Sequence, residues 1–412
     1  MKNSLAKKIL LALSMVGPGL FLIGYNIGTG SITTMAKAGA EFGMSLFWTV
    51  VLSCIFTYIL MVAYGQVTLV SGKTALYNIK TQIPFGKFIA IYIMLALIIG
   101  ELLALMGIMG IVADLIQEGI RLIGSGLTVS TLLITLILSL GLFLLLWRGR
   151  YQMFEKILTG FVVFMGLCFL IVFFLVKPDI SAIFKGLIPQ IPNRPGTLGL
   201  IAAMVGTTCS AAVFIVRSIV LSEKGWSAED LKLEKKDALV SAAMMLFLSG
   251  LIMAVAAGTL HLMGSRLTDT IEMIQLFHPL GGNTAALILI LGITGAALST
   301  IFPIILIAPW LICDYLQKPR DIRSPLFRIL GLVGLLFGFT LQFIDKRPPA
   351  MMIFSQGFQA FILPAVTLPI LYLINQKSVM GTHTAGVRMN AGIICVFLFA
   401  VLTSYFAILE LF

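Results

Sequence analysis

Two runs of glycine and small polar residues interrupt long apolar segments of this chain. The first run, residues 24–31 (GYNIGTGS), lies inside an apolar segment from about residue 9 to residue 40, and the second, residues 204–210 (MVGTTCS), lies inside the segment 198–221. Their polar side chains are Asn26, Thr29, Ser31, Thr207, Thr208, Cys209 and Ser210. Hydroxyl, amide and backbone carbonyl oxygens are suitable ligands for magnesium, calcium, sodium or a hydrated cation, and Cys209 adds one soft donor. Backbone N–H groups at residues 28–31 would instead suit the carboxylate of a small organic solute.

The glycines of these runs predict broken helices. Each glycine costs about 1 kcal/mol in a helix interior, and backbone groups freed inside a bilayer find no water to bond. One interpretation is a pair of broken helices whose ends face a bound solute or ion, and the other is a glycine face that packs two helices together. Interruptions at matching positions in the two halves of a chain favour the binding site.

Glu101 is the third candidate for chemistry. It lies about 13 residues, or about 20 Å of helix, into the third apolar segment, which places it near the middle of a bilayer. A carboxylate at that depth is costly and marks function by default. We therefore predict that Glu101 exchanges a proton during transport, and the alternative is a structural carboxyl group hydrogen-bonded within the bundle.

Composition defines the class of protein. Of the 412 residues, 59% are hydrophobic and 11% are charged, whereas soluble domains carry about 25% charged residues. We expect an all-α polytopic membrane protein with eleven transmembrane helices, which start near residues 9, 44, 88, 127, 157, 198, 238, 284, 326, 351 and 391. The short amphipathic stretch 267–277 is expected on the surface, and the charged stretch 226–237, which is helical in pattern, in a loop. The five cysteines are scattered and indicate neither a disulfide framework nor a zinc site.

The charged loops predict the topology. With the N-terminus in the cytoplasm, 20 of the 28 lysines and arginines fall on the inner side, which places the C-terminus outside. The net charge of +11 is spread over short loops, so we expect no nucleic acid partner. Residues 9–176 and 198–375 then form a 5+5 inverted repeat of LeuT type with helices 1 and 6 broken, and residues 389–410 form an extra helix in the same single domain.

Further motifs are spread along the chain. They are Gly17-Pro18-Gly19, residues 38–43 (AGAEFG), 69–73 (LVSGK), 154–156 (FEK), 165–169 (MGLCF), 177–179 (KPD), 185–187 (KGL), Ser355-Gln356, Leu363-Pro364 and 377–381 (KSVMG). Together they resemble the Nramp family of divalent-metal transporters over most of the chain. The resemblance implies the family's membrane fold and metal transport, and it aligns Gln356 with a family glutamine near the ion path.

The chain departs from this family at its metal-binding motifs. The family's Asp-Pro-Gly-Asn positions are occupied by Gly28-Thr29-Gly30-Ser31, and its Met-Pro-His positions by Ser210-Ala211-Ala212. In the third helix, the family has an aspartate and a glutamate that pass protons. This chain has apolar residues at roughly those positions, Ile108 and Ile111, and keeps one carboxylate, Glu101. The metal-binding aspartate and the soft thioether ligand are therefore absent from their usual positions.

We predict a secondary transporter that moves a divalent cation of the manganese, iron or magnesium class by alternating access, with Glu101 as the proton-coupling group. The alternative is a LeuT-fold permease for an amino acid or another small solute, and a sensor on a transporter scaffold is a third class. The predicted substrate-binding residues are Asn26, Gly28, Thr29, Ser31, Thr207, Cys209, Ser210 and Gln356, with Asn26, Gly28, Ser31 and Ser210 as candidate metal ligands. No enzyme motif or cofactor site is visible, so we expect no catalytic residues and no cofactor other than the transported ion. The expected setting is a bacterial-type inner membrane, with the lipid bilayer as surroundings and a monomeric chain.

Other polar residues receive simpler predictions. Arg217 and Arg328 are expected to anchor helices at the cytoplasmic surface, and Asp114 to lie near the outer vestibule. Asp314 is expected to pair with Lys318 or Arg320. None of the three histidines, His261, His278 and His383, is expected to be a metal ligand.

Overall fold

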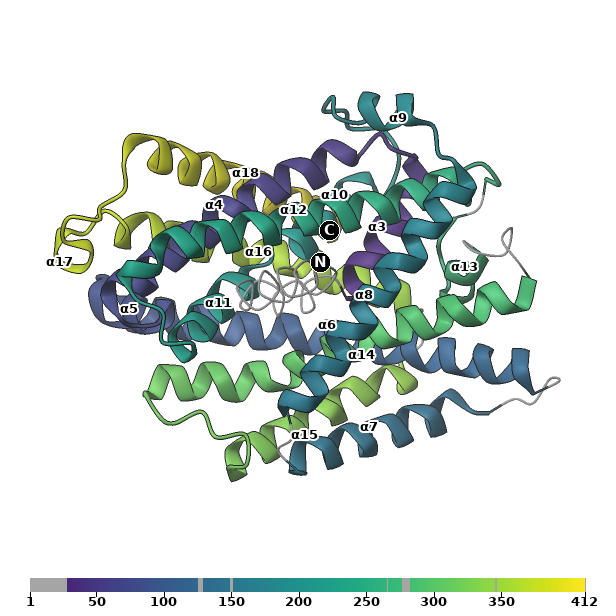
Figure 1. The fold of residues 1–412 in the computed structure, drawn as a ribbon, viewed down its shortest axis with the longest axis horizontal. Helices are drawn as coiled ribbons and strands as arrows, with labels where there is room; N and C mark the ends of the chain where they lie inside the picture. The colour runs from purple at the N-terminus through teal and green to yellow at the C-terminus, as the bar shows by residue number, and fades with distance from the viewer. Residues whose placement is uncertain are drawn as a thin grey trace, which may run out of the picture.

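The structure is a computed structural model of the chain, and it describes residues 28–124, 129–148, 151–264, 266–275, 282–344 and 347–411. Every regular element in these ranges is helical, and the long helices run roughly side by side through one bundle (Figure 1). This arrangement confirms the predicted all-α class. Asn26, His278 and the first half of the predicted first helix lie outside the described residues.

Nine helical segments of the described chain are long and apolar enough to cross a membrane. They are α4 (Phe47–Ser71), α6 (Gly86–Ile123), α7 (Thr131–Arg148), the pair α10 (Thr197–Thr208) and α11 (Ala211–Glu223), α12 (Leu231–Gly258), α14 (Gly282–Leu316), α15 (Pro325–Phe339), α16 (Pro348–Leu373) and α18 (Val387–Leu411). Two more helices occupy predicted spans, α3 (Thr29–Phe42) in the second half of the first and α8 (Tyr151–Val176) in the fifth. The total of eleven spans, the repeat boundaries and the orientation of the termini stay predictions.

Short helices join the long ones. They are α5 (Ala75–Gln82), α9 (Ile180–Lys185), α13 (Thr270–Gln275), α17 (Lys377–Met380) and the 3₁₀ turns η1 (Ala228–Asp230) and η3 (Thr340–Phe343). The amphipathic stretch 267–277 contains α13. The helical pattern of 226–237 is confirmed by η1 and by the start of α12 at Leu231, and its assignment to a loop was wrong in part for the same reason. Glu234 and Asp237, in the first two turns of α12, pair with the buried Arg217, as described below.

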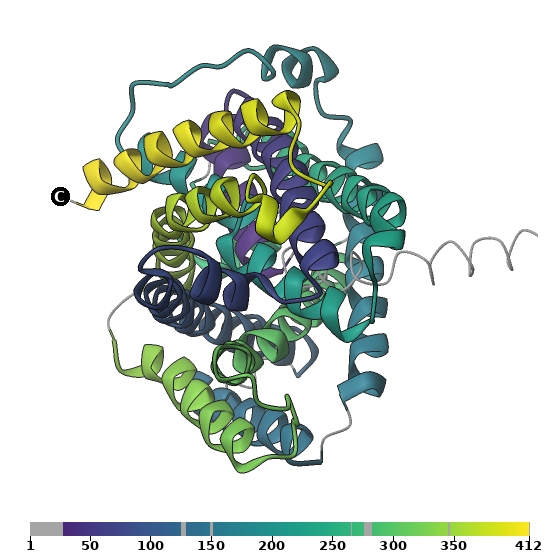
Figure 2. The ribbon, with the colours of Figure 1, turned by 90° about the vertical axis from the view of Figure 1, so that its left-hand side faces the viewer.

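The centre of the bundle holds the interrupted segments. Of the apolar stretch within α10 and α11, 94% is buried, against 22% for α7. Helix α3 packs against α10 and α12, and α16 packs against α6, α10 and α18. Figure 2 looks along the bundle and shows α7 and α15 together at one edge. The helices that carry the predicted site residues therefore lie inside, and those at the edge present apolar side chains outward.

The predicted interruption of the sixth span is confirmed. Helix α10 ends at Thr208 and α11 begins at Ala211, with Cys209 and Ser210 between them. Ser210 has extended backbone angles, and its carbonyl accepts a hydrogen bond from the N–H of Val213. At the first run, α3 begins at Thr29 directly after Gly28.

Candidate substrate site

A small cavity lies where the two interrupted segments meet α6, α14 and α16. Its volume is about 30 Å³, close to the space of one water molecule. Its walls are formed by Gly28, Gly30, Glu101, Ala104, Ile108, Thr207, Ser210, Thr300, Ile304, Met352, Gln356 and Gln359. The fold thus brings five of the residues singled out in the sequence, Gly28, Glu101, Thr207, Ser210 and Gln356, to one place.

The two interrupted segments touch directly beside this cavity. The hydroxyl groups of Ser31 on α3 and Thr207 on α10 share a hydrogen bond of 2.9 Å, and both side chains are buried. A Cβ atom on Gly28 would lie 1.8 Å from Thr300 Oγ1, and one on Gly206 would lie 1.9 Å from the carbonyl oxygen of Gln356. The glycines therefore serve close packing, as one interpretation of the runs predicted, and Gly28 also lines the cavity, while the binding of a solute or ion there stays a prediction.

Glu101 reaches the cavity from α6. Its side chain is only 5% exposed. Gln359 on α16 donates a hydrogen bond of 2.8 Å from Nε2 to Glu101 Oε1. In the part of the chain that the structure describes, Gln359 Oε1 is buried and has no hydrogen-bond partner. A buried carbonyl oxygen without a partner is costly, and here it belongs to a residue of the cavity wall.

Other predicted residues lie near the cavity without forming its wall. Thr29, Ser31 and Cys209 are all buried next to wall residues. The thiol of Cys209 is free, since the described cysteines form no disulfides. This burial is compatible with the packing role that free cysteine commonly has.

Five wall residues were missed in the sequence, two of them aliphatic (Ala104 and Ile304) and three with an oxygen or sulfur atom in the side chain (Thr300, Met352 and Gln359). Gln359 follows Gln356 by one helical turn, and this i, i+3 spacing in an apolar segment was a usable signal. Met352 precedes Gln356 by four residues and thus occupies the same helix face. For Thr300 the sequence offered one local signal, which is its position next to Ser299 in an otherwise apolar stretch.

The donors of the cavity can be grouped by chemistry. One carboxylate, two amides and three hydroxyl groups supply hard oxygen atoms, and the thioether of Met352 supplies a soft donor. Within the described residues, no group of three or more His, Cys, Asp or Glu side chains is placed to hold a metal ion. Because one donor is a carboxylate and the others are neutral, the wall suits a single cation.

Arg217 contradicts the prediction of a surface anchor. Its side chain is fully buried, and Nη2 lies 3.0 Å from Glu234 Oε1 and 2.8 Å from Asp237 Oδ2. Both carboxylates belong to the start of α12, the stretch predicted as a loop. Arg217 can be buried because its two carboxylate partners are buried with it, and a buried charge requires a partner of opposite charge.

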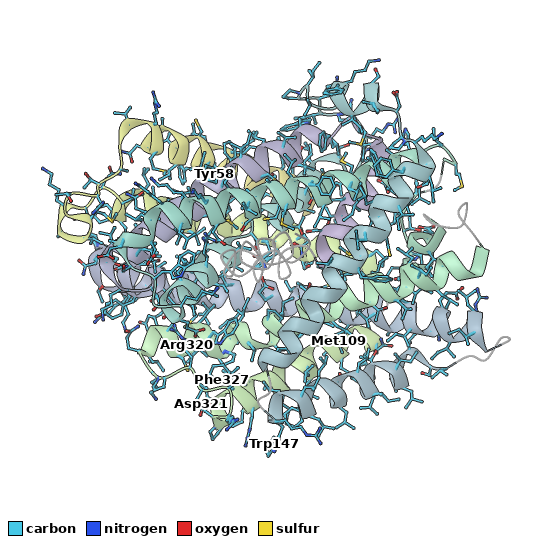
Figure 3. All side chains as sticks on the ribbon, in the orientation of Figure 1. Tyr58, Met109, Trp147, Arg320, Asp321 and Phe327 are labelled. Carbon is cyan, nitrogen blue, oxygen red and sulfur yellow. The ribbon has the colours of Figure 1, made fainter. Side chains whose placement is uncertain are left out.

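A second ionic group lies at the end of α14. Arg320 contacts Asp314 at 3.1 Å, which confirms one of the two predicted pairings, and it also contacts Glu223 at the end of α11 at 2.9 Å. Figure 3 labels Arg320 beside Asp321 and Phe327. Arg328 lies over the ring of Trp147, at 4.1 Å from the ring centroid.

The remaining polar predictions concern residues away from the cavity. Asp114 accepts a hydrogen bond of 2.8 Å from Thr270, which ties α6 to α13. The ring of His261 is hydrogen-bonded to the carbonyl of Ala40 at 2.9 Å. Neither residue contributes to the cavity wall.

Residues 19–410 match the Nramp family, described as natural resistance-associated macrophage protein-like. The chain belongs to the Nramp family. It is similar to a protein named divalent metal cation transporter MntH from Yersinia enterocolitica, with 25% identity over 387 residues that cover 90% of this chain and 88% of that protein. A protein of the same name from Klebsiella pneumoniae is 25% identical over 406 residues, which cover 94% and 92% of the two chains.

Solved structures share the fold of this Nramp protein. A manganese transporter from Eremococcus coleocola superposes with a TM-score of 0.73 at 17% identity, covering 97% of this chain and 86% of that one. MhsT, solved in complex with L-phenylalanine, superposes with a TM-score of 0.64 at 14% identity, covering 96% and 98% of the two chains. The LeuT-type fold is thereby confirmed, and the protein is a multi-pass membrane protein of a transporter family.

The carboxylate of the cavity wall lies outside the first span. The positions that resemble the family's Asp-Pro-Gly-Asn motif contain no acidic residue, and the sequence before Gly28 contains none either. Among the described wall residues the carboxylate comes from α6, as Glu101. It therefore belongs to the third predicted span.

Proposed function

We propose that this Nramp protein moves a divalent metal cation of the manganese, iron or magnesium class across the membrane by alternating access. The observation that carries the proposal is the cavity at the two interrupted segments, with Glu101 in its wall. Family membership and the relatives named as divalent metal cation transporters support the same substrate class. Candidate ligands are Asn26, Ser31, Ser210 and the backbone around Gly28.

The size and donors of the cavity support an ion over a larger solute. A volume of about 30 Å³ accommodates one water molecule or one largely dehydrated ion. Oxygen donors suit magnesium, calcium and manganese, and a thioether shifts preference toward transition metals. Desolvating a divalent ion in a neutral site is expensive, and a nearby carboxylate lowers that cost.

We further propose that transport is coupled to protons through Glu101. A carboxylate near the middle of the bilayer is a common element of proton relays. The side chain is buried at the cavity wall, where a proton and a substrate ion can influence one another electrostatically. The interrupted helix at Cys209 and Ser210 offers a hinge at which α11 can move relative to α10.

A permease for an amino acid or another small organic solute is the second candidate. The missing aspartate at Gly28–Ser31 favours it, because N–H groups at the start of α3 then face no competing carboxylate from their own motif. Its substrate would require a cavity larger than the one described, so the helices around it would have to separate further.

Uptake by the full-length protein in proteoliposomes distinguishes the two functions. Manganese, magnesium and calcium are each offered with and without an inward proton gradient, followed by a panel of amino acids. Saturable uptake of one cation that rises with the proton gradient supports the proposal. Uptake of an amino acid, with no uptake of any cation by protein of verified fold, overturns it in favour of the permease.

A further inference from the structure

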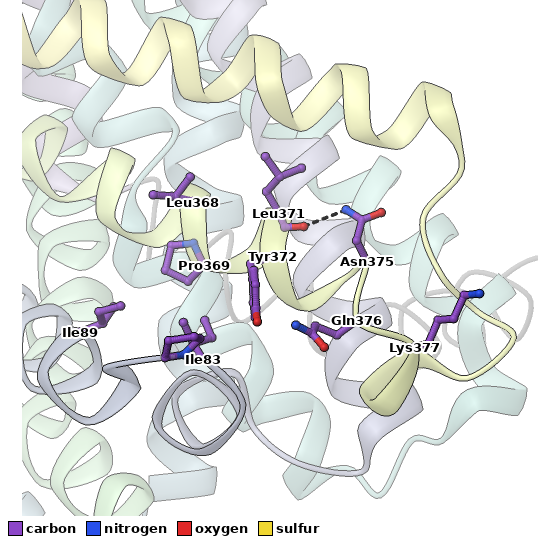
Figure 4. A pocket seen from close by; sticks show the side chains of 10 residues that line it. Ile83, Ile89, Leu368, Pro369, Leu371, Tyr372, Asn375, Gln376 and Lys377 are labelled. Atoms are coloured by element: carbon purple, nitrogen blue, oxygen red, sulfur yellow. Dashed lines mark hydrogen bonds between the residues drawn. The ribbon is translucent and has the colours of Figure 1, made fainter.

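A larger groove lies on the outside of the bundle, away from the substrate cavity. It has a volume of about 740 Å³ and runs between the end of α16 and the turn that joins α5 to α6 (Figure 4). Its apolar part is formed by Ile83, Pro84, Ile89, Leu368, Pro369 and Leu371. This volume is in the range of sites that bind small ligands, and none of the predicted site residues lies in it.

The surface beside the groove is apolar and exposed. Phe85, directly before α6, is 81% exposed, and Phe88, Tyr92, Leu95 and Ile99, which recur at helical spacing on α6, are between 49% and 74% exposed. On the opposite wall, Leu368 is 54% exposed. In a membrane protein such a stripe faces the hydrocarbon of the bilayer. The groove therefore opens sideways toward lipid.

The polarity of the groove changes along its length. Leu368, Pro369 and Leu371 lie within α16, whereas Asn375, Gln376 and Lys377 follow its end at Leu373. Tyr372, whose ring is apolar and whose hydroxyl is polar, lies between the two parts (Figure 4). Tyrosine prefers this position at the boundary of a membrane. An occupant must accordingly be apolar at one end and polar at the other.

The charge at the polar end selects the kind of occupant. Lys377 is the only charged side chain in the groove wall, and Lys87, in the first turn of α6, is exposed at the same end of that helix. The distribution of lysine and arginine predicts that this end faces the cytoplasm. The cytoplasmic leaflet carries anionic lipids that basic pockets between membrane helices recognise.

We propose that this groove binds one anionic phospholipid. An acyl chain lies between α16 and the α5–α6 turn, and the phosphate group lies at Lys377. The proposal is independent of which substrate the protein transports, because no groove residue belongs to the substrate cavity.

Native mass spectrometry of the full-length protein tests this proposal. The purified protein is delipidated in detergent, and either phosphatidylglycerol or phosphatidylcholine is added back. We expect retention of one phosphatidylglycerol in preference to phosphatidylcholine. Lys377→Gln is expected to weaken phosphatidylglycerol retention about fivefold, the effect of one lysine near an anionic headgroup. Leu368→Trp, which fills the apolar part, is expected to weaken retention of both lipids.

Matched controls come from exposed residues elsewhere. Lys318→Gln removes an exposed lysine outside the groove, and Leu336→Trp changes a leucine on α15 that is 59% exposed. Both should retain the lipid like the wild type. Equal retention of the two lipids by the wild type overturns the proposal. So does equal retention by Lys377→Gln and Lys318→Gln, or a protein dimer that forms in place of the lipid complex and is lost in Leu368→Trp.

Discussion

Gln359 donates a hydrogen bond of 2.8 Å from its amide nitrogen to Glu101 Oε1, and this contact joins α16 to α6 at the wall of the substrate cavity. When the carboxylate is ionised it only accepts hydrogen bonds, so the amide nitrogen of Gln359 faces it and the amide oxygen points elsewhere. The bond thus orients both side chains at once. Gln359 is a neutral donor, so this contact brings no positive charge to Glu101.

Replacing Glu101 with glutamine should abolish uptake driven by a proton gradient. The substitution keeps the size of the side chain and removes the group that binds and releases the proton. Wild-type uptake in proteoliposomes should rise as the outside pH falls, because protonation of Glu101 from the outer side then becomes more frequent. In Glu101→Gln this dependence on pH should be lost.

Asp114→Asn provides the matched control for this substitution. It removes one carboxylate from the same helix, at a position bonded to Thr270 and outside the cavity wall. It should keep the pH dependence of the wild type. Unchanged uptake and unchanged pH dependence in Glu101→Gln would exclude Glu101 as the coupling group.

Gly28 should not tolerate a side chain. Its Cβ would lie 1.8 Å from Thr300 Oγ1, so Gly28→Val must push α3 away from α14 or block the cavity. Overpacking of this kind costs about 1–3 kcal/mol, and uptake should be lost.

A rescue variant tests the cause of this loss. Gly28→Ala should also lose uptake, and adding Thr300→Gly to it should recover part of the uptake because the clashing atoms are removed. Gly357→Ala, where a Cβ meets no atom within 4 Å, should behave as the wild type. Full uptake by Gly28→Val would show that the two helices do not need this approach.

The sequence predicted the interruption of the sixth span and part of the cavity wall, because glycine and small hydroxyl groups in apolar segments are local signals. Ser210 could be named for this reason, Glu101 because it is a carboxylate inside an apolar segment, and Gln356 through the resemblance to the Nramp family. The partner of Glu101 could not, since Gln359 is 258 residues away and only the fold brings the two together. Arg217 was misread because its position at a helix end suggested a surface residue, while its burial depends on two carboxylates of another helix.

Breaking the charge cluster of Arg217 should destabilise the protein strongly. Arg217→Met leaves Glu234 and Asp237 buried without their cationic partner, which costs about 3–5 kcal/mol for a buried pair. The folded monomer should therefore be lost at a clearly lower temperature in a heating series followed by size-exclusion chromatography. Adding Glu234→Gln and Asp237→Asn to this variant should recover much of the loss, because the buried charges are then removed together.

Arg121→Gln is the control for the charge cluster. This arginine pairs with Glu118 at 2.7 Å, but its side chain is 55% exposed. Because only the arginine side of this pair is exposed, and Glu118 is 11% exposed, the unfolding temperature should fall by clearly less than in Arg217→Met. Equal unfolding temperatures for Arg217→Met and Arg121→Gln would show that the buried cluster does not stabilise the fold.

Arg320 should hold closed the end of the bundle that is predicted to face the cytoplasm, called the inner end below. Its guanidinium group contacts Glu223 at 2.9 Å and Asp314 at 3.1 Å, which ties the end of α11 to the end of α14. If α11 swings at Cys209 and Ser210 during transport, these contacts must break when the inner side opens. Partly exposed ion pairs contribute up to about 1 kcal/mol, so Arg320→Gln should raise the open population about two- to fivefold.

Cys209 reports this opening because it is fully buried in the structure. With the other four cysteines replaced, its alkylation by N-ethylmaleimide should accelerate by the same factor in Arg320→Gln. Arg323→Gln, an exposed arginine in the same loop, should leave the rate unchanged. The same alkylation rate in both variants would mean that the contacts of Arg320 do not restrain the inner opening.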